Sequence, residues 1–303
     1  MASPQLEEYR AKARKYRDKM RVAGDPVPAS ADEFRKADQF MDLLTGEPAD
    51  IECTEGSVGD VAGLWVTPKN AATTGTLLYL HGGGYVMGSS RTHRKMVGHL
   101  ATAAGVRSFI PDYRLAPEHP YPAAVEDGVA AFRGLLAEGH RPERIVLAGD
   151  SAGGGLSVAV TLALRNDGRP MPRALVLLSP WTDLSFTGAS LQTNAETDLT
   201  MTLAGAKRMA EYYCGRAKPR SPLISPLFAD LRGLPPTYIQ VGGDEMLLDD
   251  AVRLDERLRA SRVTSSIDVV AGMQHVFQFG AGTLPESDEA IMQLGSFVRE
   301  QLG

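Results

Sequence analysis

The sequence holds a serine between two glycines, where an apolar run meets an amphipathic one. Residues 145–157 read IVLAGDSAGGGLS, and this pattern predicts a strand that turns sharply into a helix. A G-x-S-x-G turn between a strand and a helix is a nucleophile elbow, which presents the serine hydroxyl at its tip. Glycine is expected at 149 and 153, because a Cβ there would collide with neighbouring backbone. We therefore predict that Ser151 is a nucleophile.

A second glycine cluster follows the apolar run at 76–80. The stretch HGGGYVMG (81–88) does not fit the dinucleotide-binding pattern G-x-G-x-x-G, because Met87 occupies the third glycine position. A His-Gly-Gly-Gly turn after an early strand instead fits half of an oxyanion hole, which stabilises the negative oxygen of an acyl-transfer intermediate. The N–H groups of Gly83 and Gly84, completed by that of Ala152, are the predicted donors.

A serine hydroxyl attacks a carbonyl only when a neighbouring base accepts its proton. When a nucleophile elbow carries the serine, an acid and then a histidine follow it along the chain. Five of the six histidines precede Ser151, which leaves His275, in the loop after the apolar run at 265–270. We therefore predict that His275 is the base.

The third member of the set should be a carboxylate at the end of a later strand. Asp244 meets this condition, since it follows the strand predicted at 237–242. Its neighbour Glu245 is interpreted as a solvated residue in the first turn of the next helix, where the helix dipole favours negative charge. Asp183 also follows a predicted strand and remains an alternative. The acid would orient the imidazole and stabilise its protonated form without taking the proton itself.

Most of the chain alternates strands with helices. After a short antiparallel pair that begins near residue 50, strands are expected at 76–80, 106–111, 144–149, 174–179, 237–242 and 265–270. Helices are expected near 92–104, 122–137, 152–166, 249–260 and 285–301. Continuous apolar strands separated by helices predict an α/β fold with a mostly parallel sheet covered on both faces.

Two segments outside this alternation predict a helical cap. Before residue 48, an apolar stripe predicts a helix, and its members are Leu6, Tyr9, Ala13, Tyr16 and Met20. Nearly sixty residues separate two later strands, which is far longer than a usual connection. We therefore divide the chain into a cap segment at 1–48, a catalytic domain at 49–184 and 233–303, and a second cap segment at 185–232.

The composition excludes several classes of protein. The 303 residues carry a formal net charge of −5, so there is no basic field to bind nucleic acid or anionic lipid. The two cysteines, Cys53 and Cys214, lack the spacing of a disulfide framework or a metal site, and no metal-ligand cluster is visible. The first residues are charged and lack the apolar core of a signal peptide, and no run is long enough to span a membrane. We therefore expect a cytoplasmic protein.

Several longer motifs carry a family resemblance. They are HGGGYVMG (81–88), DYRLAPEHPYPAAVED (112–127), GDSAGGGL (149–156), GGDEMLLDD (242–250) and the pair Gln274-His275. As a set they resemble the bacterial hormone-sensitive-lipase-like esterases, the family IV carboxylesterases of the α/β-hydrolase superfamily. The resemblance runs from about residue 75 to the end of the chain. It implies an α/β-hydrolase fold with a helical cap, Ser151, Asp244 and His275 as a catalytic triad, and no metal or organic cofactor.

The resemblance also implies a class of substrate. Small-molecule esters with short- to medium-chain acyl groups would be hydrolysed through an acyl-enzyme intermediate. Residues expected in the substrate pocket are Tyr85, Trp181, Met201 and Tyr212. A lactone hydrolase with the same triad remains an alternative, and so does a non-catalytic small-molecule receptor, although receptors that resemble this family lack the histidine present here at 275. A homodimer would pair through the last strand and helix.

Overall fold

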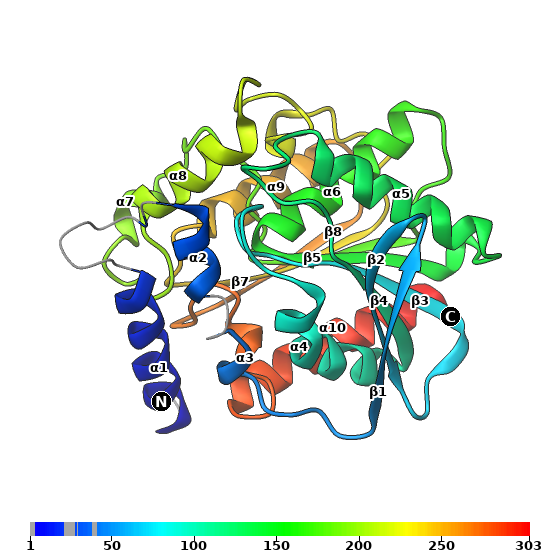
Figure 1. Ribbon diagram of the computed structural model, residues 1–303, viewed down its shortest axis with the longest axis horizontal. Coiled ribbons are helices and arrows are strands. Elements are labelled where there is room, and N and C mark those ends of the chain that lie inside the picture. The colour runs from blue at the N-terminus through cyan, green and yellow to red at the C-terminus, as the bar shows by residue number, and fades with distance from the viewer. Residues whose placement is uncertain (1–3, 21–27, 29, 38–40) are drawn as a thin grey trace.

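A single sheet organises the part of the chain that the computed structural model describes, residues 4–20, 28, 30–37 and 41–303 (Figure 1). Within these residues, eight strands lie in the order β1-β2-β4-β3-β5-β6-β7-β8. Their bounds are β1 Ile51–Val58, β2 Val61–Pro68, β3 Ala72–Leu80, β4 Val106–Pro111, β5 Ile145–Asp150, β6 Ala174–Leu178, β7 Thr237–Gly242 and β8 Ser265–Val270.

The strand directions place one set of loops along one edge of the sheet. β1 pairs with β2, and β2 with β4, in antiparallel fashion, whereas the ladders from β4 through β3 to β8 are parallel. β5 and β6 are buried at every residue, as expected for parallel strands covered on both faces. The residues that follow β3, β5, β6, β7 and β8 therefore meet at the carboxyl edge, where ligands bind in open α/β sheets.

Helices cover both faces of the sheet (Figure 1). α4 (Ser90–Ala104) packs against α10 (Pro285–Leu302) on one face, and α5 (Ala123–Ala137) packs against α6 (Ser151–Asn166) on the other. α9 (Leu248–Ala260) lies against β7 and β8. Short 3₁₀ helices occur at Pro142–Arg144, Pro226–Phe228 and Phe277–Gly280. Each strand predicted from residue 76 onward is present and the five expected helices begin within two residues of their predicted starts, so the α/β fold class is confirmed.

The remaining helices lie together at one side of the sheet (Figure 1). They are α1 (Pro4–Met20), α2 (Ala31–Ala37), α3 (Met41–Leu44), α7 (Ser190–Thr193) and α8 (Leu203–Cys214). The predicted stripe on α1 is buried at Leu6, Tyr9 and Ala13, while the side chains of Tyr16 and Met20 lie outside the described residues. The boundaries between cap and catalytic domain stay a prediction.

β8 forms one edge of the sheet and leaves an apolar side chain in solvent. Val269 on β8 is 48% exposed and Met292 on α10 is 68% exposed. The homodimer expected through this strand and helix stays a prediction. No helix in the described part of the chain combines the length and the apolar character that crossing a membrane would require.

The burial of β5 leads to a stability prediction. Leu147 is fully buried in this strand and precedes Ser151 by four residues. Leu147→Ala should therefore lower the free energy of unfolding by about 2–5 kcal/mol. Val269→Ala on the exposed edge is the control and should change it by no more than about 0.5 kcal/mol. Urea unfolding followed by circular dichroism measures both, and equal effects of the two substitutions would contradict the assigned burial.

Candidate active site

The turn between β5 and α6 has the shape of a nucleophile elbow. Ser151 begins α6 and has φ +51°, a left-handed conformation that side chains rarely adopt. The elbow packs directly on the end of β3, because a Cβ built on Gly153 would lie 2.0 Å from the carbonyl oxygen of Leu80. Only glycine fits at this contact, as the sequence predicts. The predicted strand–elbow–helix arrangement is confirmed.

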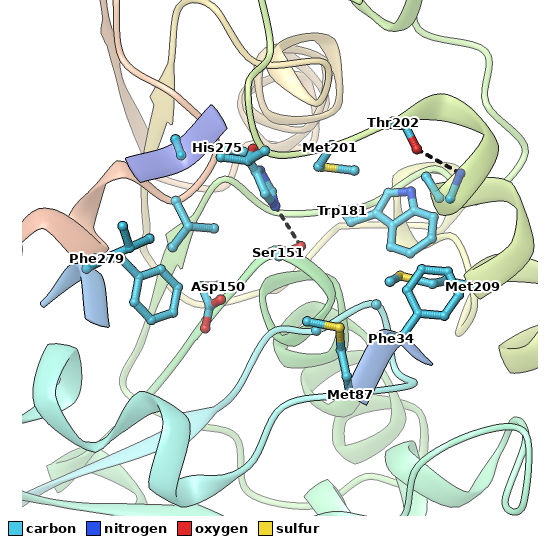
Figure 2. A pocket seen from close by; sticks show the side chains of 18 of the residues that line it. Phe34, Met87, Asp150, Ser151, Trp181, Met201, Thr202, Met209, His275 and Phe279 are labelled. Atoms are coloured by element: carbon cyan, nitrogen blue, oxygen red, sulfur yellow. Dashed lines mark hydrogen bonds between the residues drawn. The ribbon is translucent and has the colours of Figure 1, made fainter. Parts of the chain in front are cut away.

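The structure brings the predicted serine and histidine into contact. The Ser151 Oγ lies 2.9 Å from the His275 Nε2, although 124 positions separate the two residues in the sequence (Figure 2). His275 lies in the loop after β8, and Ser151 lies at the end of β5, so the sheet supplies the alignment. At this distance the Ser151 hydroxyl donates a hydrogen bond to the Nε2 of His275 when the imidazole is neutral. Their catalytic roles stay predictions at this point.

The carboxylate next to the histidine belongs to Glu245. Its Oε1 lies 2.9 Å from the His275 Nδ1, and its side chain is fully buried. Its Oε2 accepts hydrogen bonds from the Ser179 hydroxyl at 2.7 Å and from the Gly242 N–H at 2.8 Å. The imidazole is therefore held on one side by a carboxylate and on the other by the serine hydroxyl.

The prediction of Asp244 as the partner of the histidine is wrong, and so is the interpretation of Glu245 as a solvated residue. Asp244 has a side chain 33% exposed, and its Oδ2 lies 3.6 Å from a guanidinium nitrogen of Arg10. Position at a strand end identifies the right turn but not the residue within it. The turn after β7 directs Glu245 inward, and its extra methylene lets the carboxylate reach back to the N–H of Gly242.

The alternative acid, Asp183, also lies elsewhere. Its carboxylate accepts hydrogen bonds from Ser185 and from the N–H of Thr187, and it pairs with Arg253 at 3.3 Å. These contacts fix the loop after β6. Asp183 therefore serves local structure, and in the described part of the chain its carboxylate makes no hydrogen bond with His275.

Two opposing effects set the pKa of His275. Burial disfavours the imidazolium and would lower the pKa, but the charge and hydrogen bond of Glu245, aided by the charges of Asp198 and Asp150, raise it more. The net pKa lies above the ordinary histidine value of 6.5. The buried carboxylate thus stabilises the protonated imidazole at this position.

A second buried carboxylate joins the elbow to the glycine loop, residues 82–88. Asp150, next to the serine, accepts hydrogen bonds at its Oδ1 from the Tyr79 hydroxyl at 2.9 Å and from the Gly82 N–H at 3.0 Å. The Nε2 of His93 lies 3.4 Å from the same carboxylate. Burial would raise the pKa of Asp150, but the charge and hydrogen bond of His93, together with the hydrogen bond from Tyr79, bring the pKa below its ordinary value. The backbone at Gly82 is therefore fixed relative to Ser151.

The glycine loop presents bare backbone to the cavity above Ser151. Gly83 has φ +112°, and a Cβ there would lie 2.2 Å from the carbonyl oxygen of Met87. Gly83 and Gly84 line the same cavity as Ser151. Ala152 lies in the first turn of α6, where backbone N–H groups have no acceptor within the helix. Within the described residues, none of these three N–H groups donates a hydrogen bond to another group of the chain.

A cavity of about 120 Å³ lies over the serine and is mostly apolar. Figure 2 shows Trp181, Met209, Phe34 and Met87 on one side of Ser151 and Phe279 on the other. The further lining side chains are Tyr9, Ala13, Pro28, Leu44, Asp150, Thr200, Met201, Thr202, Ala206, His275 and Val276. Residues from both predicted cap segments thus contribute to its walls.

Only part of the predicted pocket set lines this cavity. Trp181 and Met201 line it, whereas Tyr85 and Tyr212 do not. The ring of Tyr85 instead stacks on Tyr213 with centroids 3.7 Å apart, and Tyr212 is half-buried against the core. Met87 and Phe279 also line the cavity, and no motif in the sequence assigns them to it. Both lie within four residues of a motif glycine or of His275, and this proximity was the available signal.

The described residues contain no group of three or more histidine, cysteine, aspartate or glutamate side chains arranged to hold a metal ion. The polar groups at the cavity are instead a hydroxyl, an imidazole, carboxylates and backbone N–H groups. This combination is suited to transfer of an acyl group.

The chain is similar to known hydrolases in sequence and in structure. The α/β-hydrolase-fold family model matches residues 77–279. An acetyl-hydrolase of Streptomyces hygroscopicus is 42% identical, and the match covers 89% of each chain. Among solved structures, an esterase from the bacterial hormone-sensitive lipase family has a TM-score of 0.94 and 45% identity, with both chains covered completely.

A further solved structure is that of EstE5 soaked with p-nitrophenyl butyrate. It has a TM-score of 0.92 and 41% identity, and the match covers 99% of each chain. The family match at 77–279 extends over the elbow, the glycine loop and the loop that carries His275. The chain therefore belongs to the α/β-hydrolase family and, within it, to the bacterial hormone-sensitive lipase family of esterases.

Proposed function

We propose that this protein is a serine carboxylesterase that hydrolyses small esters with short acyl groups through an acyl-enzyme on Ser151. The observation that carries the proposal is a continuous chain of contacts, 2.9 Å from Ser151 to His275 and 2.9 Å from His275 to the buried Glu245. This chain ends in an apolar cavity that an ester can enter. Its order of groups is that of a Ser-His-acid triad with glutamate as the acid.

In the first half-reaction the Ser151 Oγ attacks the carbonyl carbon of the ester. Its proton passes to the His275 Nε2 as the new C–O bond forms. The bond from the carbonyl carbon to the alcohol oxygen then breaks, and His275 returns the proton to that oxygen. The alcohol leaves, and the acyl group remains on Ser151.

In the second half-reaction a water molecule replaces the alcohol. His275 accepts a proton from this water as its oxygen attacks the acyl carbon, and then returns the proton to the Ser151 oxygen as the acyl bond breaks. The carboxylic acid leaves, and the starting enzyme is restored. Glu245 keeps the Nδ1–H tautomer in place and stabilises the imidazolium in both halves, without taking the proton.

Both half-reactions pass through a tetrahedral intermediate with a negative oxygen. The N–H groups of Gly83, Gly84 and Ala152 are proposed to donate to it. Their position at the cavity and at the first turn of α6 supports this role, and the positive end of the α6 dipole adds to it. Loss of one such donor typically costs about 3 kcal/mol of transition-state stabilisation.

The size of the cavity supports short acyl groups. Its volume of about 120 Å³ is slightly below that of the engineered cavity of about 150 Å³ that holds benzene. The related protein from Streptomyces is named an acetyl-hydrolase, and crystals of EstE5 were soaked with a butyrate ester. The contact between His275 and Ser151 argues for catalysis over the alternative of a non-catalytic receptor.

The serine can be tested directly. Ser151→Ala should lower kcat for p-nitrophenyl acetate by about 10⁴- to 10⁶-fold, because the nucleophile is lost while the cavity is kept. His275→Ala should have a similar effect. Steady-state kinetics on purified variants measures both, with circular dichroism as a check on folding. Retention of most activity by either variant would refute the triad.

The acid can be distinguished from its neighbour by paired substitutions. Glu245→Gln should lower the plateau of kcat by about 10⁴-fold, whereas Asp244→Asn should leave kcat within a few-fold of wild type. Only neutral His275 accepts a proton, so kcat/KM falls as pH drops through its raised pKa, with a midpoint above 6.5 in the wild type. In Glu245→Gln, burial is opposed by fewer charges, and the midpoint should move to lower pH. The reverse ranking of the two variants would restore Asp244 as the acid.

The acyl preference can be measured with a series of p-nitrophenyl esters. We expect kcat/KM to be highest for acetate and butyrate and to fall about tenfold or more by decanoate, because the longer chain exceeds the cavity. Met209→Ala should shift the optimum to longer chains, since Met209 forms part of the wall. A rising series up to decanoate in the wild type would contradict the proposed preference, and faster hydrolysis of a small lactone than of every ester would favour a lactonase.

A further inference from the structure

Two helices of the N-terminal segment each place one arginine on the backbone beside the candidate active site. Arg10 lies on α1 and Arg35 lies on α2. Arg10 contacts the histidine loop, residues 271–276, and Arg35 contacts the glycine loop, residues 82–88.

Arg10 bridges the two stretches that supply the imidazole and its carboxylate. Its Nη2 donates to the carbonyl oxygen of Gly272 at 3.0 Å and lies 3.6 Å from the Asp244 carboxylate. Gly272 precedes His275 by three residues, and Asp244 is the neighbour of Glu245. One guanidinium therefore connects the loop that carries His275 with the turn that carries Glu245.

Apolar contacts hold the same part of α1 against the histidine loop. Leu6 and Tyr9 are buried in a cluster that includes Met273 and Phe277. Met273 lies inside the histidine loop, next to Gly272. The contact of Arg10 is therefore the polar rim of a packed interface rather than a chance meeting of surface groups.

Arg35 makes the equivalent contact with the glycine loop. Its Nε donates to the carbonyl oxygen of Val86 at 3.0 Å, and its Nη2 donates to that of Ala116 at 3.1 Å. The carboxylate of Glu118 holds the same guanidinium through two hydrogen bonds, at 2.9 and 2.6 Å. The guanidinium in turn brings the pKa of Glu118 to about 2, so this anchor stays ionised at neutral pH.

The part of the glycine loop that Arg35 reaches is conformationally strained. Tyr85 has φ +64°, and its carbonyl accepts from the N–H of Ala116 at 2.9 Å. The N–H of Val86 donates to the carbonyl of Gly83 at 3.1 Å. A non-glycine residue in this conformation needs surrounding contacts to hold it. Arg35 completes them, so it acts on the peptide planes that follow Gly83 and Gly84.

We propose that Arg10 and Arg35 are positioning residues through which the N-terminal segment fixes the two halves of the active site. Arg10 sets the histidine loop relative to Glu245, and Arg35 sets the glycine loop relative to Ser151. Neither touches the substrate. The proposal rests on the proposed function, since it assigns these loops to acyl transfer.

The test compares each arginine with an exposed cation on the same helix. Arg10→Met and Arg35→Met keep the apolar stem and remove the guanidinium, and Arg14→Met and Lys36→Met, at exposed positions, are the controls. We expect kcat for p-nitrophenyl acetate to fall about 10- to 100-fold in the first pair, because small displacements of catalytic groups have effects of this size. KM should change by less than about threefold, and the controls should match wild type.

A second readout separates positioning from folding and from turnover. A fluorophosphonate labels an activated serine, and mass spectrometry gives the rate of labelling at Ser151. This rate should fall in parallel with kcat in Arg10→Met and Arg35→Met, at a temperature where circular dichroism shows each variant fully folded. Arg10→Lys and Arg35→Lys, which keep the positive charge but present their donors on a single nitrogen, should recover part of the loss and replace any methionine variant that does not fold.

The outcomes distinguish the two levels of inference. If wild type shows no Ser151-dependent esterase activity, the proposed function fails, while the labelling rates still report on the arginines. If folded variants label and turn over within about twofold of Arg14→Met and Lys36→Met, the positioning role is refuted. An equal loss in all four variants would refute it as well, because it would reflect charge removal from the cap in general.

Discussion

The arrangement of the candidate active site depends on the burial of one carboxylate. A carboxylate removed from water is strongly destabilising unless donors surround it. Glu245 finds them on three separate segments, from the Ser179 hydroxyl after β6, the Gly242 N–H at the end of β7 and the His275 imidazole after β8. The Ser179 hydroxyl also accepts from the N–H of Val276 at 3.1 Å. Ser179 has φ +47° and Val276 has φ +48°. A non-glycine residue in this left-handed conformation costs about 1–3 kcal/mol of free energy. The hydrogen bonds around Glu245 explain why these two strained residues persist in the loops after β6 and β8.

A second buried carboxylate, that of Asp150, anchors the glycine loop as Glu245 anchors the imidazole. Asp150 lies at the end of β5 and accepts a hydrogen bond from the N–H of Gly82, the first residue of the glycine loop, which follows β3. Tyr79 on β3 donates to it as well, so the ends of two neighbouring strands share one anion. Burial and the nearby His93 lower the pKa of His81 to about 4, so this residue adds no charge to the network at neutral pH. Each half of the site thus has its own electrostatic anchor, and the parallel ladders between β3 and β8 connect the two.

The sequence predicts those features that depend on the order and polarity of residues along the chain. Apolar runs identify the strands, and glycine spacing identifies the elbow. Chain order identifies His275 as the histidine that contacts Ser151. It does not predict features that depend on the direction of a side chain within an irregular turn. Asp244 and Glu245 are adjacent and both acidic, and only the path of the backbone after Gly242 decides which one points inward. Tyr85 fails as a pocket residue for the same reason, because its left-handed backbone turns the ring onto Tyr213.

The N-terminal segment becomes part of the site because the sheet cannot satisfy the backbone beyond its own ends. The ladder between β7 and β8 ends at Gly242 and Val270, and that between β3 and β5 ends at Leu80 and Gly149. Carbonyl groups in the loops beyond these points need donors from elsewhere. A guanidinium is well suited to this need, since its planar set of N–H groups can bind a carbonyl and a carboxylate at once. Two arginines that precede the first strand supply such donors, and Phe34, next to Arg35, forms part of the cavity wall. The helices that carry Arg10 and Arg35 therefore contribute to the wall of the cavity and also donate hydrogen bonds to the loops beside it.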